Sequence, residues 1–167
     1  MQHQVPTWIT AWFIISGLLQ FFDTAFLLLR PRSLANGDLA GFFSFHNNVY
    51  LKADPSYGDL SEKAVWAQPV MNTIESAVAL FAFVALRGGR RFALLAVVAA
   101  MSFWKTVSYF AFASFITLQS LENPLFWQVC LLPSTFWLWV PLCVIYVLLN
   151  RIDALTSTGA AAKKKQQ

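Results

Sequence analysis

The sequence contains long apolar runs, and one of them, Trp66 to Leu86, carries a carboxylate in its interior. At about 1.5 Å of rise per residue, a helix over this run matches the hydrocarbon core of a bilayer in length. Gln68, Asn72 and Glu75 recur at i, i+4 and i+7, so they share one face of that helix. An acidic residue in mid-membrane costs about 2.5–3.5 kcal/mol on translocon scales. Glu75 must therefore be protonated, paired, or next to a polar cavity.

The overall composition agrees with a membrane location. Hydrophobic residues make up 57% of the 167 positions and charged residues 12%, whereas soluble domains carry about 25% charged residues. The net charge of +4 comes from bases that stand in short groups at the ends of apolar runs. This is the pattern of positive-inside topology, so we predict an integral membrane protein and no nucleic-acid partner.

The fold class that follows is an all-α membrane protein, a four-transmembrane-helix bundle with a long lumenal loop between helices 1 and 2. Arg30-Pro31-Arg32 ends the first helix, because proline removes a donor and disfavours helix before it. The loop is rich in aromatic residues, which predicts an ordered cap on the membrane surface with a short helix near Leu39 to Tyr50. One domain, 1–153, holds the predicted spans at about 8–29, 66–86, 92–118 and 125–149.

The distribution of bases predicts the topology. With four spans, Arg87, Arg90, Arg91, Arg151 and the lysines of the C-terminal tail fall on one side, so both termini should be cytosolic. The tail, 154–167, ends in Lys-Lys-Gln-Gln, which resembles the dilysine retrieval signal of endoplasmic reticulum membrane proteins. The alternative is a lysine-rich tail that only binds anionic headgroups.

The cysteines and histidines predict neither a disulfide nor a metal site. Cys130 and Cys143 fall in one predicted span, where they would lie about 20 Å apart along the axis. His3 and His46 stand alone, and there is no Cys-x-x-Cys pair. We expect no metal and no cofactor.

Polar residues from different spans fall at similar depths. Asp23 on the first span, Glu75 on the second and Ser134 on the fourth lie roughly 9 to 14 Å below the lumenal surface, with Lys105 on the third a little deeper. This predicts one buried site for a ligand or for catalysis. The alternatives are interhelical hydrogen bonds that only hold the bundle, and Lys105 as a structural counter-ion.

Several blocks of the sequence resemble the EXPERA-domain family, which includes sterol Δ8–Δ7 isomerases and the sigma-2 receptor. The central block runs from Tyr50 to Phe83, YLKADPSYGDLSEKAVWAQPVMNTIESAVALFAF, and contains a K-x-D-x-x-Y element and a helical Glu-Ser pair. The further blocks are WKTVSYF, ENPLFW and STFWLWVP, which begin at Trp104, Glu122 and Ser134. The matching blocks are collinear and cover roughly the whole chain after Trp8.

The resemblance implies a helical bundle in the endoplasmic reticulum membrane with a cavity for a sterol-like or cationic amphiphilic ligand. In the isomerases an acid protonates an alkene and aromatic faces stabilise the carbocation. Carried over by position, Glu75 and Asp23 form the acid/base pair, Trp137 is the cation-π wall, and Ser134 stands where the isomerase has asparagine. The chain departs from the isomerase pattern at Leu19, where those enzymes have histidine, and at Lys105-Thr106, where they have glycine-aspartate.

Two functions follow as hypotheses. In both, the expected partners are the bilayer and a lipophilic small molecule or sterol. A homodimer is one expected oligomeric state. The first is an endoplasmic reticulum membrane isomerase or cyclase that uses acid-base chemistry on a sterol-like, terpenoid or polyketide substrate. The alternative is a non-catalytic sterol- or lipid-binding regulatory protein of the sigma-2 receptor type. The candidate catalytic residues are Asp23, Glu75 and Lys105, and the candidate ligand-binding residues are Gln20, Asp54, Tyr57, Asn72, Tyr109, Ser134 and Trp137.

Overall fold

The computed structural model describes residues 4–112 and 122–164, and within these ranges all regular secondary structure is helical. Four helices there are long and apolar enough to cross a membrane, the last together with the π-helix η3 (Phe126–Leu131) that precedes it. The predicted all-α class is therefore confirmed, and four helices have the length and composition of the predicted spans. The four helices are α1 (Thr7–Leu28), α3 (Lys63–Ala85), α4 (Gly88–Phe112) and α6 (Leu132–Lys164).

The observed bounds agree with the predicted spans for α1 and α3 and differ for the other two helices. Helix α4 begins at Gly88, earlier than the predicted position 92, because Gly88 takes a φ of 55° that lets the chain turn directly into the helix. The predicted end at 118 lies outside the described residues. Helix α6 does not end at 149 but continues to Lys164, since no proline follows Pro141 and alanines are frequent there. Most of the predicted tail is thus part of this helix, and residues 165–167 lie outside the description.

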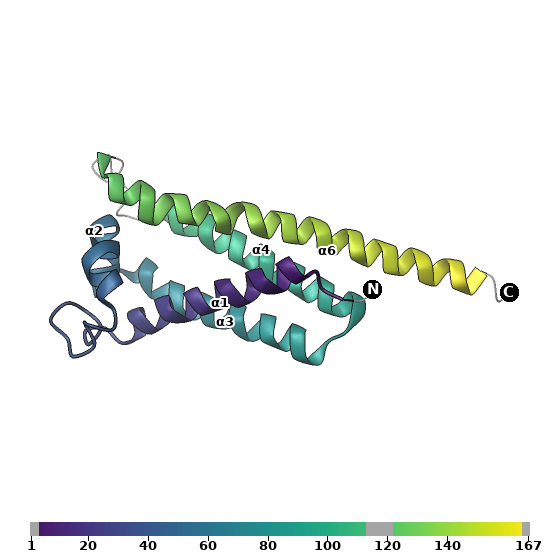
Figure 1. The fold of residues 1–167 in the computed structure, drawn as a ribbon, viewed down its shortest axis with the longest axis horizontal. Helices are drawn as coiled ribbons and strands as arrows, with labels where there is room; N and C mark the ends of the chain where they lie inside the picture. Colours follow the sequence, from purple (N-terminus) through teal and green to yellow (C-terminus); the bar gives the residue numbers. More distant parts are fainter. Residues whose placement is uncertain (1–3, 113–121, 165–167) are drawn as a thin grey trace.

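The long helices run along a common axis, with α1 packed on α3, α3 on α4, and α4 along α6 (Figure 1). The start of α1 and the end of α6 lie at the same end of the bundle, and the connection between α1 and α3 lies at the opposite end (Figure 1). With an even number of spans both chain ends lie at the same end of the bundle, because each span crosses to the other side.

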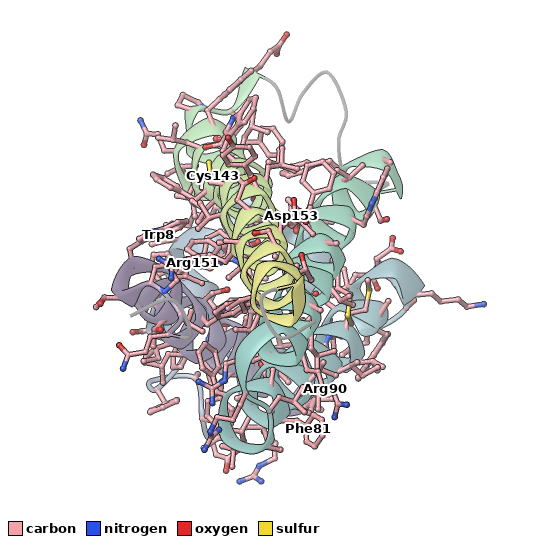
Figure 2. All side chains as sticks on the ribbon, turned by 90° about the vertical axis from the view of Figure 1, so that its right-hand side faces the viewer. Trp8, Phe81, Arg90, Cys143, Arg151 and Asp153 are labelled. Carbon is pink, nitrogen blue, oxygen red and sulfur yellow. The ribbon has the colours of Figure 1, made fainter. Side chains whose placement is uncertain are left out.

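Basic residues gather at the end of the bundle that carries the two chain ends. Figure 2 looks onto this end and shows Arg90 at the start of α4 and Arg151 on α6. Arg151 Nη1 donates to the carbonyl of Gln4 at 3.1 Å, which ties α6 to the N-terminal segment. Arg91 donates to the carbonyls of Leu86 and Phe83, at 2.9 and 3.0 Å, and so satisfies backbone groups that the end of α3 leaves open.

The connection between α1 and α3 is built from turns and three short helices. These are the π-helix η1 (His46–Tyr50), α2 (Leu51–Ala53) and the 3₁₀-helix η2 (Pro55–Gly58), so a helical segment lies within the predicted 39–50 region. Buried Arg30 holds the connection in place. Its Nη1 donates to the Tyr57 carbonyl at 2.8 Å, and its guanidinium lies 4.6 Å from the ring centroid of Trp66.

Two apolar clusters hold the bundle, one at each end. The first, near the chain ends, joins α1, α3, α4 and α6 through side chains such as Ile9, Phe92 and Leu148. The second packs the connection onto the other end of α1 around Phe26 and Phe43. Large apolar side chains on the outside of the helices remain exposed, which suits contact with lipid. Examples are Phe21 at 72%, Trp139 at 68% and Leu80 at 64%.

Candidate functional site

A buried ion pair joins α3 and α4 between the two apolar clusters. Lys105 Nζ lies 3.0 Å from Glu75 Oε2, and the two side chains are 7% and 3% exposed. Lys105 also donates to Asn72 Oδ1 at 2.6 Å. Opposite charges at this depth compensate each other, so that neither stands alone in an apolar medium.

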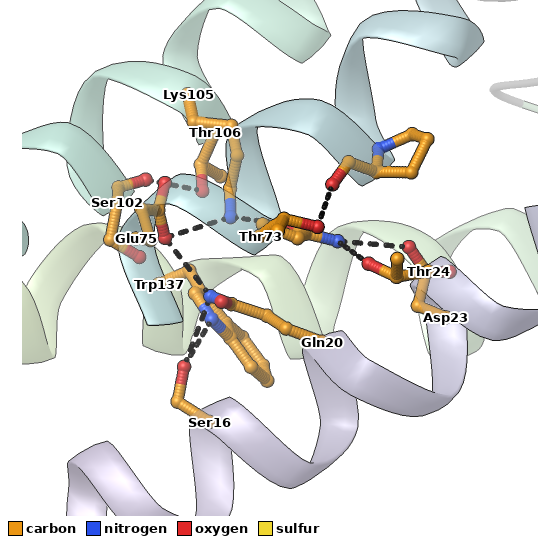
Figure 3. Close-up of polar contacts among 12 residues, drawn as sticks. Ser16, Gln20, Asp23, Thr24, Thr73, Glu75, Ser102, Lys105, Thr106 and Trp137 are labelled. Carbon is orange, nitrogen blue, oxygen red and sulfur yellow. Dashed lines mark hydrogen bonds and ion pairs between the residues drawn. The ribbon is translucent and has the colours of Figure 1, made fainter. Parts of the chain in front are cut away.

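The other two long helices connect to this pair through Ser16 and Gln20 of α1 (Figure 3). Gln20 Nε2 donates to Glu75 Oε2 at 3.1 Å and to Ser16 Oγ at 3.3 Å. From α6, Trp137 Nε1 donates to the same Ser16 hydroxyl at 3.1 Å. All four spans therefore contribute a side chain to one hydrogen-bonded network. From α6 this residue is Trp137 and not the predicted Ser134, whose hydroxyl donates to the Cys130 carbonyl at 2.6 Å.

Asn72 links the ion pair to Asp23. Its amide oxygen accepts from Lys105, while its Nδ2 lies 3.4 Å from Asp23 Oδ2 and 3.2 Å from Thr24 Oγ1. The amide is thus oriented at both ends, with its acceptor toward the cation and its donors toward α1. Asp23 and Lys105, 82 positions apart in the chain, are separated by this single side chain.

Asp23 also meets the connection between α1 and α3. His46 Nε2 lies 3.7 Å from Asp23 Oδ1, and the Tyr57 hydroxyl donates to Asp23 Oδ2 at 3.4 Å. The His46 ring stacks on Phe26, with centroids 4.3 Å apart and planes inclined by 16°. His46 Nδ1 is buried without a hydrogen-bond partner among the described residues. A carboxylate and an imidazole in this arrangement can exchange protons with a bound molecule.

Sequence reasoning missed His46 as a site residue. It lies in the connection, 23 positions after Asp23, so no helical periodicity relates the two. Its one signal in the sequence is that it is a lone histidine within an aromatic stretch, Phe42 to Tyr50.

A second polar cluster surrounds Asp54, which is fully buried. Its Oδ1 accepts from the Ser56 amide at 3.0 Å and from the Ser56 hydroxyl, and its Oδ2 accepts from Tyr109 of α4. Burial raises the pKa of the Asp54 carboxyl, an effect that the hydrogen bonds from Ser56 and Tyr109 oppose. Asp54 therefore anchors the connection to α4.

A cavity of about 490 Å³ opens beside these groups. Asp23, His46 and Lys105 lie on its wall, and most of its remaining surface is apolar or aromatic. A concave, largely apolar site with a few convergent polar groups is typical of small-molecule binding. The predicted site residues that line it are Gln20, Asp23, Tyr57, Asn72, Lys105, Tyr109, Ser134 and Trp137, and the lining residues beyond that prediction include His46, Gln68, Tyr50 and Cys130.

Two predicted site residues do not line this cavity. Glu75 lies behind Lys105, where the ion pair and the Gln20 hydrogen bond occupy its Oε2. Asp54 lies behind Tyr109. Each is one contact away from the cavity wall, so each would act on a bound molecule through the residue in front of it.

The geometry defines a class, a multi-span helical protein whose four apolar helices enclose ionisable groups at the wall of a cavity. Across residues 4–112 and 122–164, no three histidine, cysteine or acidic side chains come together as metal ligands. Comparison of the chain with protein-family models, curated proteins and solved structures gives no match. The EXPERA resemblance therefore rests on the sequence blocks described above.

Proposed function

We propose that the protein is an endoplasmic reticulum membrane isomerase or cyclase that acts by acid-base chemistry on a lipophilic substrate. One observation carries the proposal: Asp23 and His46, 3.7 Å apart, both lie on the wall of a mostly apolar cavity between membrane-spanning helices. Such a pair supplies a proton acceptor and a proton donor to a molecule that enters from the bilayer. The substrate class is a sterol-like, terpenoid or polyketide molecule, and the sterol-like member of this class is the one that the EXPERA resemblance implies.

Asp23 is the group best placed to move a proton to or from carbon. Tyr57 and Asn72 donate to its Oδ2, His46 lies beside its Oδ1, and its side chain remains 24% exposed. Trp137 forms part of the same cavity wall, with its indole N–H held by Ser16. The ring is thus oriented, as an aromatic wall beside a reacting centre requires.

The proposed location combines the endoplasmic reticulum with cytosolic termini. Support for the cytosolic termini comes from the basic residues at the end of the bundle that carries both chain ends. The endoplasmic reticulum is the membrane that the EXPERA resemblance implies. Protease protection of tags at each terminus, in sealed microsomes, tests the topology, and digestion of both tags from outside is the expected result.

Solvent-deuterium incorporation tests the catalytic proposal without knowledge of the substrate. Membranes carrying the protein are incubated in D₂O, and their neutral lipids are analysed by mass spectrometry. An acid-base isomerase or cyclase places a solvent deuteron on carbon, so the wild type should label a lipid that control membranes do not. Asp23→Asn should reduce this labelling by about 10²-fold or more, while the exposed-site variant Asp38→Asn should retain it. Wild-type labelling by Asp23→Asn would contradict the proposal.

A second candidate function is non-catalytic sterol or lipid binding of the sigma-2 receptor type. The observation that favours it is the placement of Glu75, one of the two predicted acids, in an ion pair behind the cavity wall. This function predicts saturable binding of radiolabelled cholesterol, loss of binding in Asp23→Asn, and no deuterium in any lipid. Labelling by the purified wild type would exclude it.

A further inference from the structure

Lys105 presents a positive charge to the cavity that the proposed acid-base pair does not use. A lysine ammonium has three N–H donors. The structure gives two of them acceptors among the described residues, Asn72 Oδ1 at 2.6 Å and Glu75 Oε2 at 3.0 Å. Lys105 is itself a residue of the cavity wall, and its third donor has no acceptor among the described residues.

The ion pair places its positive charge nearer the cavity than its negative charge. Lys105 lines this cavity and Glu75 does not, so the positively charged residue of the pair is the one next to a bound molecule. A cation forming in the cavity would be repelled by this ammonium, whereas an anion forming there would be stabilised. The site therefore suits a reaction that develops negative charge on oxygen better than one that develops a carbocation.

We infer that the substrate is a lipophilic ketone, and that Lys105 binds its carbonyl oxygen while Asp23 moves a proton on the adjacent carbon. This inference rests on the proposed function and names its substrate class. The Asp23 carboxylate takes a proton from the carbon next to the carbonyl. The electron pair of that C–H bond forms a C=C bond, and the carbonyl π pair moves to the oxygen as an enolate held by Lys105. For a β,γ-unsaturated ketone, return of the proton to the γ-carbon gives the conjugated isomer, with no other reactant.

The separation of Lys105 Nζ and the Asp23 carboxylate fits a carbonyl group together with its adjacent carbon. Asn72 bridges Lys105 Nζ at 2.6 Å and Asp23 Oδ2 at 3.4 Å, so with the width of one amide the two atoms lie at most about 8 Å apart. A carbonyl oxygen hydrogen-bonded at one end, with its α-carbon in contact with a carboxylate at the other, spans about the same distance. One small functional group can therefore touch both residues.

The test compares ketone and alkene probes with purified protein in nanodiscs in D₂O. The ketone probes are a steroid with a β,γ-unsaturated ketone and an acyclic isoprenoid with the same group. The alkene probe is a sterol with an 8,9 double bond and no ketone. Deuterium on carbon is measured by mass spectrometry, and the conjugated enone by its ultraviolet absorbance. The expected result is labelling and conjugation of a ketone probe at least 100-fold faster than labelling of the alkene.

The variant Glu75→Gln/Lys105→Met removes both charges of the pair and so leaves no unpaired ion in the bundle. It should slow the ketone reaction at least 100-fold, while the matched pair Glu62→Gln/Lys63→Met, at the start of α3, should not. Labelling of the alkene but not the ketones, or an unchanged ketone rate in Glu75→Gln/Lys105→Met, would overturn the inference and leave the proposed isomerase or cyclase standing. Absence of labelling in every probe and in the membrane lipids would overturn both.

Discussion

The strongest test of the described network is to break the ion pair between Lys105 and Glu75 one partner at a time. At 3.0 Å and an effective dielectric constant of about 20, their Coulomb attraction is about 5.5 kcal/mol. Lys105→Met leaves the Glu75 carboxylate buried with only Gln20 as a hydrogen-bond donor among the described residues. The expected loss in the free energy of unfolding is about 3–5 kcal/mol, the usual cost of an uncompensated buried charge.

The measurement is unfolding in mixed detergent micelles, followed by the circular dichroism of the helices. For a chain of this size the expected loss corresponds to a fall in Tm of about 10 °C. Glu75→Gln/Lys105→Met should recover to within about 1 kcal/mol of the wild type, because neither charge remains. Lys63→Met, which removes an exposed lysine, is the control for the loss of one positive charge.

Either of two results would refute the buried ion pair. A cost below about 1 kcal/mol for Lys105→Met would mean that water or lipid compensates Glu75, so that the pair is not buried as described. A double variant as unstable as the sum of the two single variants would mean that the residues do not interact.

Three further predictions concern the connection between α1 and α3, which caps one end of the bundle, and its contacts. Burial raises the pKa of Asp54, so the native state holds this proton more tightly than the unfolded chain does, and the stability of the protein should fall as pH rises from 3.8 toward the raised native value. In Asp54→Asn, Tm measured over the same pH range should lack this fall. The same fall in the variant as in the wild type would contradict the assignment. Phe43 is 1% exposed in the cap's apolar cluster, so Phe43→Ala should cost about 3–5 kcal/mol in unfolding free energy, measured in micelles, and a cost under about 1 kcal/mol would show that the cap does not pack on α1. His46→Phe keeps an aromatic ring against Phe26 but removes the proton carrier, so deuterium labelling should fall by about 10²-fold with Tm retained; full labelling would remove His46 from the chemistry.

The contact between Asp23 and His46 shows where sequence reasoning reached its limit. Asp23 is recognisable because a carboxylate in an apolar span needs a partner or a polar cavity. The partner could not be named, since His46 comes from a connection whose path depends on turns, on the anchoring of Arg30 and on the packing of Phe43. Periodicity relates residues on one helix and has no bearing on how a loop folds back over it.

Packing likewise decided which member of the Glu75–Lys105 pair lines the cavity. Both Glu75 and Lys105 were predicted as members of one buried site, and the structure places them 3.0 Å apart. Which of the two faces the cavity depends on the rotation of α3 and α4 about their axes, and that rotation follows from how the helices pack. In the observed packing, Lys105 lies on the cavity wall and Glu75 lies behind it.

By itself the sequence determined that the chain is helical and apolar enough to cross a membrane four times, because span length and composition are local properties that lipid imposes on each segment. It also determined which spans carry ionisable groups. Only the tertiary structure decided which of those groups meet, where the cavity lies, and that a histidine from the cap joins them. These are relations between segments far apart in the chain, and they depend on side-chain packing that no single segment specifies.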